Sequence, residues 1–219
     1  MALYGSHLRF AEDVKNDFNI KDENKYFSGT VYPDSRYYTK IERNLAHDKR
    51  YLERSFYIHD DFRKGWAVHL LYDDLQFSMI DKLFPELFDS TGIKYGNNNW
   101  ITRTVLKILQ DMDDVKNCDI GTLVKHLKYI ETPNREEAKL IEKYNQRIIE
   151  VYSRSGPLTI NDYFYLGQPM EMKGDIIEKL NDEIITMQRN LLVMEKISFL
   201  YDHTFNAYKD MNREDTTLN

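Results

Sequence analysis

Residues 60–80 read DDFRKGWAVHLLYDDLQFSMI, and this stretch decides the fold class. Six of its residues recur at steps of four or three, which is the period of one face of an α-helix. We therefore predict a helix over about 60–83, with Asp60 or Asp61 as the capping residue at its start. The face expected to point inward carries Phe62, Trp66, His69, Asp73, Gln76 and Ile80.

The rest of the chain has the same helical character. Glycine and proline number only 9 and 5 among the 219 residues, which is roughly half of their usual share. Alternating polar and apolar residues joined by Asn-Gly or Asp-Gly turns are absent, and this counts against a β-sheet protein. The sequence thus predicts an all-α fold, a bundle of six to eight helices with an internal metal site.

Capping residues and apolar spacing indicate where the other helices lie. They are expected at about 7–18, 100–112, 119–131, 134–153 and 173–210, with one helix or two short ones within 35–57. Ser6, Asp119 and Asn134 are the expected capping residues of three of them. Gly29 and Pro33 stop helix propagation and predict an ordered loop there.

We expect these helices to form one domain over residues 1–211. Its metal-site half covers 1–91 and its helical second half covers 100–211. The two halves are separated by a stretch rich in glycine and asparagine at 92–99, which is the strongest internal break. Residues 212–219 are expected to form a frayed polar tail.

Composition excludes several classes of protein. The 30 basic and 36 acidic residues leave a net charge of −6, which argues against a general nucleic-acid-binding protein. One cysteine, Cys118, excludes a disulfide framework and a cysteine-based zinc module. No apolar run approaches the roughly 18 residues of a membrane span, and no signal peptide is visible at the start. We therefore expect a soluble, cytoplasmic protein.

Histidine and aspartate gather in the first third of the chain. Four of the six histidines lie within the first 69 residues, with several aspartates among them. Imidazole and carboxylate together are ligands of Zn²⁺, Mn²⁺ or Fe²⁺. His69 and Asp73 stand four residues apart on the inward face of the predicted helix, so both can reach one ion. An ionised carboxylate on that face is costly unless a cation or strong donors meet it.

Each of these residues also has a simpler interpretation. His69 and Asp73 can form a buried hydrogen bond between helices, and His7, on the apolar stripe of its helix, can be a core histidine. Asp34 can be a turn residue because it follows a proline near a glycine. His47 can be exposed. The occurrence of all five together is what favours a metal site.

Their order along the chain resembles the metal-binding half of the zinc-dependent phospholipase C family, whose all-helical fold is shared with fungal single-strand nucleases. The motifs are His7, Gly29-x-x-x-Pro33-Asp34, His47 and Gly65-Trp66-x-x-His69-x-x-x-Asp73, and the match covers about residues 7–76. The resemblance implies that the metal ligands are His7, Asp34, His47, His69 and Asp73. It also implies that Asp34 lies near the nucleophilic water as the catalytic residue and that Asp73 bridges two ions.

The resemblance implies a hydrolase that cleaves a phosphoester with a metal-activated water. The family's later ligands, two further histidines and a glutamate, have no counterpart, since no histidine occurs between His69 and His126. We therefore expect one or two ions, zinc first, with manganese or iron as alternatives. Arg36 and Arg43 are the expected substrate-binding residues, because guanidinium groups bind phosphate bidentately. The expected substrate is a phosphoester-containing small molecule or a lipid head group, with nucleic acid left open; the sequence does not indicate an oligomeric state.

Two alternatives remain open at this point. An HD-type phosphohydrolase would use His7, His47, Asp48 and Asp73, with His59-Asp60 as a second candidate dipeptide. A non-catalytic helical module would hold a structural metal and bind a partner through the long helix of the second half. His126 and His203 lie on predicted helices, and His203 is expected to pack in the core.

Overall fold

A computed structural model describes residues 3–88 and 99–217 of the chain. Regular structure in these residues is entirely helical, which confirms the all-α prediction. Eight α-helices in the described part of the chain have eight residues or more, and four are single turns. The total exceeds the predicted six to eight because of these single turns. No described helix combines the length and the apolar character that a membrane crossing requires.

The bounds of the longer helices are α1 Tyr4–Val14, α2 Glu23–Val31, α6 Asp61–Leu83, α7 Asn99–Asn117, α9 Ala138–Tyr152, α10 Ile160–Gly167, α11 Gly174–Arg189 and α12 Leu191–Thr217. The single turns are α3 Arg36–Thr39, α4 Arg43–Ala46, α5 Arg54–Tyr57 and α8 Ile120–Leu123. Short 3-10 helices, among them η1 Tyr32–Ser35, η2 Lys49–Leu52 and η5 Val124–His126, connect several of them.

The predicted helix over 60–83 is confirmed as α6. The Asp60 side chain accepts a hydrogen bond from the backbone N–H of Arg63, and so caps the helix as expected. The inward face is buried from Phe62 to Ile80, apart from Asp73, whose side chain is about a quarter exposed (26%). Helix α6 packs against α2 on one side and α12 on another.

The prediction of a loop around Gly29 and Pro33 is wrong, because these residues are helical. Gly29 lies inside α2, and η1 follows that helix directly, with Pro33 in its first turn. A Cβ added at Gly29 would stand 1.9 Å from the carbonyl oxygen of Phe62, and one added at Gly65 would stand 1.9 Å from that of Tyr26. The two glycines therefore allow the backbones of α2 and α6 to touch, a role that a local sequence pattern does not distinguish from a helix stop.

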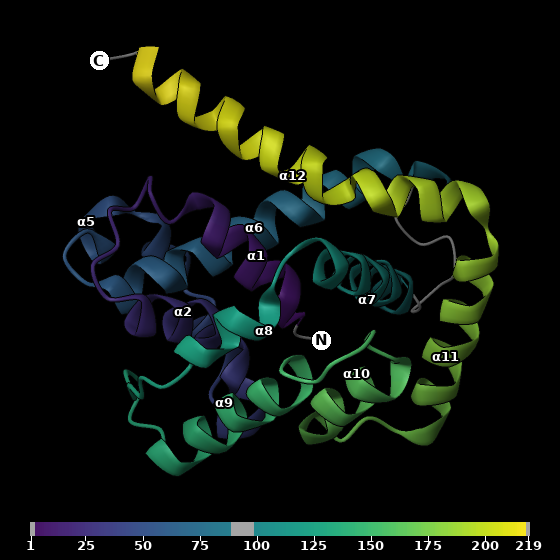
Figure 1. The fold of residues 1–219 in the computed structure, drawn as a ribbon, viewed down its shortest axis with the longest axis horizontal. Helices are drawn as coiled ribbons and strands as arrows, with labels where there is room; N and C mark the ends of the chain where they lie inside the picture. The colour runs from purple at the N-terminus through teal and green to yellow at the C-terminus, as the bar shows by residue number, and fades with distance from the viewer. Residues whose placement is uncertain (1–2, 89–98, 218–219) are drawn as a thin grey trace.

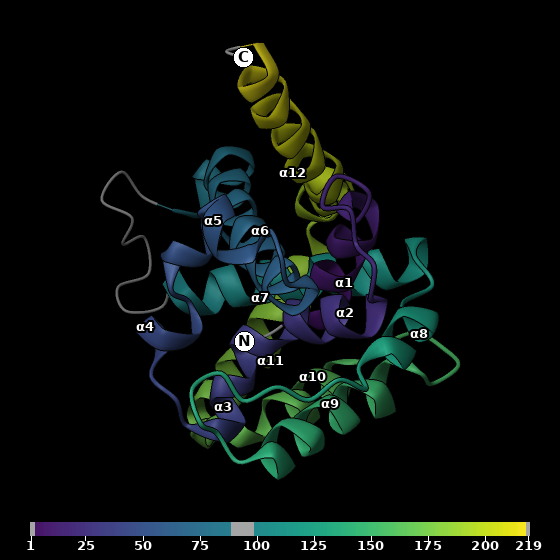
Figure 2. The ribbon, with the colours of Figure 1, turned by 90° about the vertical axis from the view of Figure 1, so that its left-hand side faces the viewer.

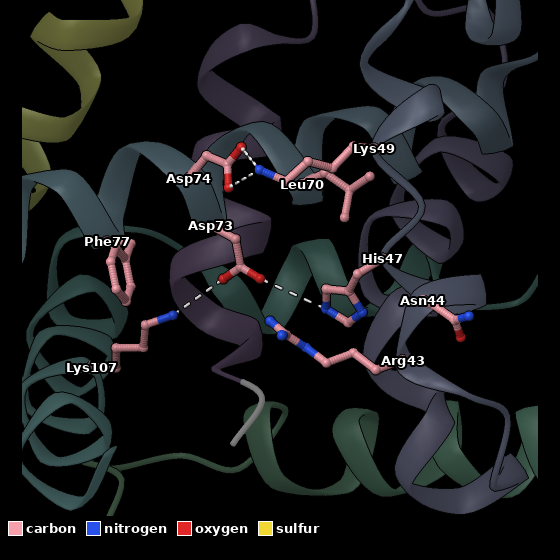
Figure 3. Close-up of a pocket in the computed structure, with 9 residues that line it drawn as sticks. All are labelled: Arg43, Asn44, His47, Lys49, Leu70, Asp73, Asp74, Phe77 and Lys107. Atoms are coloured by element: carbon pink, nitrogen blue, oxygen red, sulfur yellow. Dashed lines mark hydrogen bonds and ion pairs between the residues drawn. The ribbon is translucent and has the colours of Figure 1, made fainter. Parts of the chain in front are cut away.

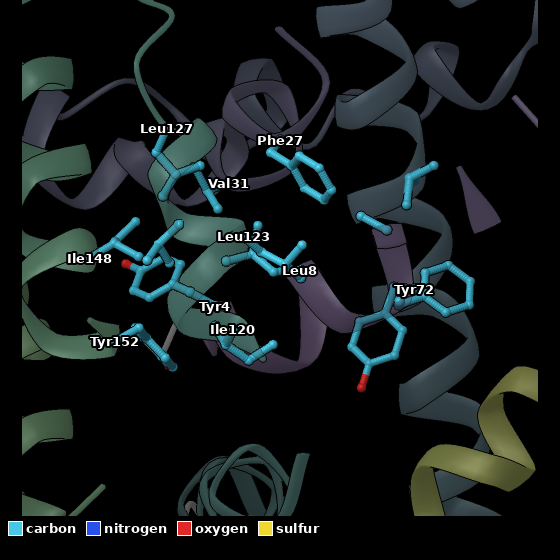
Figure 4. Close-up of a cluster of buried hydrophobic side chains, with 14 of the residues drawn as sticks. Tyr4, Leu8, Phe27, Val31, Tyr72, Ile120, Leu123, Leu127, Ile148 and Tyr152 are labelled. Atoms are coloured by element: carbon cyan, nitrogen blue, oxygen red, sulfur yellow. The ribbon is translucent and has the colours of Figure 1, made fainter. Parts of the chain in front are cut away.

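Two large clusters of buried apolar side chains form the core. The first joins α1, α2, α8 and α9, and Figure 4 shows Tyr4 and Leu8 of α1 between side chains of the other three helices. The second joins α7, α11 and α12 to the end of α6. In Figures 1 and 2, α9 and α10 lie below α1 and α2, while α12 crosses the opposite side and extends beyond the body.

The prediction of one continuous helix over 173–210 is wrong, because the helix is interrupted at Asn190. This residue has an extended backbone (φ −88°, ψ 100°) and separates α11 from α12. Its side-chain oxygen accepts a hydrogen bond from the backbone N–H of Val193, which caps the second helix. Helix α12 then continues to Thr217, into the segment predicted as a polar tail.

Several other boundaries differ from the predictions. Helix α1 begins at Tyr4, so Ser6 is not its capping residue, and α9 begins at Ala138 with Glu137 instead of Asn134 before it. The region 119–131 forms only α8 and η5, although Asp119 caps α8 as predicted. Helix α10 was not predicted; a capping box of Thr159 and Asp162 begins it. Residues 92–98 of the predicted break lie outside the described residues.

A buried polar network ties α1 to α7. Asp111 accepts hydrogen bonds from the backbone N–H of Ser6 (2.7 Å) and from the hydroxyls of Tyr152 (2.7 Å) and Tyr163 (2.8 Å). One turn later, Asp114 pairs with Arg9 at 2.7 Å. Burial raises the pKa of the Asp114 carboxyl to about 7, even though the Ser6 hydroxyl and the Arg9 guanidinium favour its charged form.

Because α2 and α6 touch at Gly29 and Gly65, we predict that one added methyl group at either glycine strongly destabilises the fold. Gly29→Ala or Gly65→Ala should lower the free energy of unfolding by more than about 2 kcal/mol, because backbone atoms cannot move aside as a flexible side chain can. Urea titration followed by circular dichroism measures this. Gly174→Ala is the matched control, since nothing lies within 4 Å of its added Cβ. Equal stability of all three variants would contradict the close approach of α2 and α6.

The Asp114 carboxyl predicts a pH dependence of stability. Its pKa rises from 3.8 in the unfolded chain to about 7 on folding, so the folded protein binds this proton more tightly. The stability that protonation of Asp114 contributes is fully present below about pH 4 and is lost as the pH rises through 7. The free energy of unfolding then falls by up to about 1.4 kcal/mol per pH unit. Asp114→Asn removes the titrating group, so urea titrations at several pH values should show a smaller loss of stability in the variant. Identical slopes would contradict the assignment.

Candidate metal centre

The structure brings all five side chains of the predicted ligand set together. They come from separate parts of the chain: α1, η1, the residue after α4, and two successive turns of α6. Their ligand atoms form two overlapping groups, each with all atoms within 4.8 Å of one another. The groups are His7, His69 and Asp73, and Asp34, His47 and His69.

Backbone carbonyls orient two of the three imidazoles. Nδ1 of His7 lies 2.8 Å from the carbonyl oxygen of Leu3, and Nδ1 of His69 lies 2.8 Å from that of Thr30. A carbonyl only accepts, so Nδ1 donates and the lone pair of each neutral ring is on Nε2. Both Nε2 atoms are buried and have no hydrogen-bond partner among residues 3–88 and 99–217. Metal-binding histidines are held in this way by their second nitrogen.

The distances between ligand atoms suit a coordination shell better than direct hydrogen bonds. Nε2 of His7 is 3.5 Å from one Asp73 oxygen, and Nε2 of His69 is 3.6 Å from the other. Nε2 of His47 is 3.8 Å from both Asp34 and Asp73. Ligand atoms at the usual zinc distances stand roughly 3.3–3.6 Å apart at the corners of a tetrahedron. The donor set and its spacing therefore fit a zinc-like cation.

Electrostatics keep the two carboxyl groups ionised. Burial favours neutral Asp73, but Lys107 and then His7 outweigh it and hold the pKa of this carboxyl well below its usual range. For Asp34, burial raises the pKa, but at the low pH where this carboxyl titrates the protonated forms of His69 and His47 favour the carboxylate, and the net effect is a lowered pKa. Both carboxylates are therefore charged at neutral pH, as a metal site requires.

Two of the imidazoles are neutral at the same pH. Burial, followed by the stacked His7 ring with its centroid 4.1 Å away, lowers the pKa of His69 to about 3. Burial also lowers the pKa of His47. For His7, burial lowers the pKa, but the carboxylate of Asp73, 3.5 Å from Nε2, outweighs it and raises the pKa, so a cation would compete with a proton at this ring.

A cleft of about 450 Å³ opens onto His47 and Asp73 (Figure 3). Its lining consists of Arg43, Asn44, His47, Lys49, Leu70, Asp73, Asp74, Phe77 and Lys107. Of the two predicted substrate-binding arginines, Arg43 lines this cleft. Arg36 does not, and its guanidinium lies 4.2 Å from the ring centroid of Tyr37. Lys107, from α7, was not predicted, because no local motif connects it to the site.

The remaining candidates of the sequence analysis lie apart from this cluster. Asp48 accepts hydrogen bonds from the backbone and guanidinium of Arg50, and His59 is exposed. His126 lies beside Glu23 and Asn24, outside both groups of candidate ligands. The prediction that His203 packs in the core is wrong: the residue is exposed on α12, and Phe199, one turn earlier on the same face, is exposed as well.

Comparisons with protein families, with curated proteins and with solved structures find no match to this chain.

The centre predicts tight zinc binding that depends on His69. Calorimetric titration of the metal-free protein with zinc should give at least one ion per chain, and elemental analysis should agree. His69→Ala should lower the affinity by more than about 100-fold, since even indirect partners of a ligand contribute 10–100-fold. His203→Ala is the matched control because its imidazole is exposed. Failure of the wild-type protein to take up zinc, manganese or iron would contradict the site.

Proposed function

We propose that the protein is a metal-dependent hydrolase that cleaves a phosphoester bond. The observation that carries this proposal is the set of three imidazoles and two carboxylates beside the cleft, in which two buried Nε2 atoms make no hydrogen bond to the described residues. Buried polar atoms without partners are costly, and a divalent cation would satisfy them together. The adjacent cleft carries Arg43, whose guanidinium suits phosphate oxygens.

A divalent ion held by these five side chains would lower the pKa of a bound water toward 7 and would so supply hydroxide at neutral pH. Asp34 is the proposed catalytic residue: its buried carboxylate accepts a hydrogen bond from the attacking water and holds it in place. His69 and His7 are kept in the correct tautomer by Thr30 and Leu3. Arg43 donates to the phosphoryl oxygens from the cleft wall.

The order of the ligands supports a relative of the zinc-dependent phospholipase C family. All five residues implied by that resemblance come together, including Asp34 and His69, which the HD-type alternative leaves without a role. That alternative also requires Asp48, whose carboxylate is engaged by Arg50. The proposed substrate is therefore a phosphoester-containing small molecule or a lipid head group, with zinc as the first candidate metal.

The proposal predicts metal-dependent turnover of p-nitrophenyl phosphate or its bis-ester, measured by absorbance with zinc or manganese present. EDTA should abolish turnover, and added zinc should restore it. Asp34→Asn should lower kcat/KM by about 10²–10⁴-fold, the usual contribution of a proton-accepting residue. Asp48→Asn is the matched control, and its activity should be unchanged.

Other outcomes separate the alternatives. Loss of activity in Asp48→Asn, with Asp34→Asn active, would favour the HD-type mechanism. Full metal binding and a metal-dependent melting temperature, with no turnover of either ester, would favour a structural metal. A chain that neither binds metal nor turns over either ester would overturn the proposal.

A further inference from the structure

Neither the metal site nor the resemblance assigns a role to Lys49 or Lys107 in the cleft, and of these two lysines Lys107 contacts the candidate ligand Asp73. We propose that Lys107 and Arg43 form a phosphate clamp across the cleft, and that the substrate is a phosphomonoester. This inference rests on the proposed function and specifies the substrate class of the same site.

The two cations reach the cleft from different halves of the chain. Arg43 begins α4 in the first half, and Lys107 belongs to α7 in the second. Figure 3 shows both side chains extending toward Asp73 from opposite sides. A phosphate between them would contact both halves of the protein at once.

The two oxygens of Asp73 face different partners. One oxygen is 3.2 Å from Nζ of Lys107 and 3.5 Å from His7, while the other is 3.6 Å from His69 and 3.8 Å from His47. A cation on the His47 and His69 side leaves Lys107 on the other side of the same carboxylate. The ammonium is therefore next to the metal ligands, at the point where a substrate oxygen would enter the cleft.

The charges around the cleft balance a dianion. Lys49 pairs with Asp74 at 3.1 Å, and the carboxylates of Asp34 and Asp73 together offset a divalent ion. Among the described residues that line the cleft, the two positive charges of Arg43 and Lys107 then remain to be balanced. A phosphomonoester carries a charge near −2 at neutral pH, whereas a phosphodiester carries −1 and would leave one cation uncompensated.

The donor geometry also suits a terminal phosphoryl group. A guanidinium donates two parallel hydrogen bonds, and an ammonium acts as a compact point charge. Lys107 is mostly covered, with 21% of its side chain exposed, so its charge is less screened than that of a surface lysine. Leu70 and Phe77 provide an apolar wall in the same cleft for the organic part of a monoester.

The test is calorimetric titration of the zinc-loaded protein with inorganic phosphate and, separately, with dimethyl phosphate. Wild-type protein should bind phosphate and should bind dimethyl phosphate at least about tenfold more weakly, because one charge is missing. Lys107→Gln should weaken phosphate binding by about 10–100-fold, the contribution of a charge-assisted hydrogen bond. Lys107→Arg keeps the charge and should retain most of the affinity.

Lys116→Gln is the matched control, because this lysine lies on the same helix but is largely exposed and pairs with Asp113. Its phosphate affinity should equal that of the wild type. Unchanged phosphate affinity in Lys107→Gln, or equal binding of phosphate and dimethyl phosphate by the wild type, would overturn the clamp while leaving the hydrolase proposal intact. Absence of zinc binding in the wild type would overturn both.

Discussion

The backbones of α2 and α6 touch at Gly29 and Gly65, and the arrangement of the candidate metal ligands depends on this contact. It sets the carbonyl oxygen of Thr30 at 2.8 Å from His69, which orients that imidazole. It also brings η1, and with it Asp34, to the turn of α6 that carries His69. Side chains larger than hydrogen at either glycine would separate the helices and move these ligands apart.

A second constraint positions the first helix against the other half of the chain. The backbone of Ser6 and the guanidinium of Arg9, on either side of His7 in sequence, are bound by Asp111 and Asp114 of α7. The same helix carries Lys107 one turn earlier. The buried aspartates thus hold His7 and Lys107 on opposing helices at a fixed separation.

The prediction of the fold succeeded where local rules suffice. Helix α6 was predicted from apolar spacing and the Asp60 cap, and both are determined by residues within one or two turns. The prediction failed where a residue has two uses. Gly29 can end a helix or allow close packing, and only its contact with Phe62 decides between them. Asn190 lies in an apolar pattern that continues on both sides, so the break there leaves no mark in the spacing.

The sequence by itself determined the helical class and a set of five possible ligands, because helical periodicity and the chemistry of imidazole and carboxylate are properties of the residues themselves. Only the tertiary structure decided that these side chains meet and that Lys107 joins Asp73 across 34 positions of the chain. Contacts at such separations depend on how helices pack, and packing is set by the shape of the whole core, which no local pattern records.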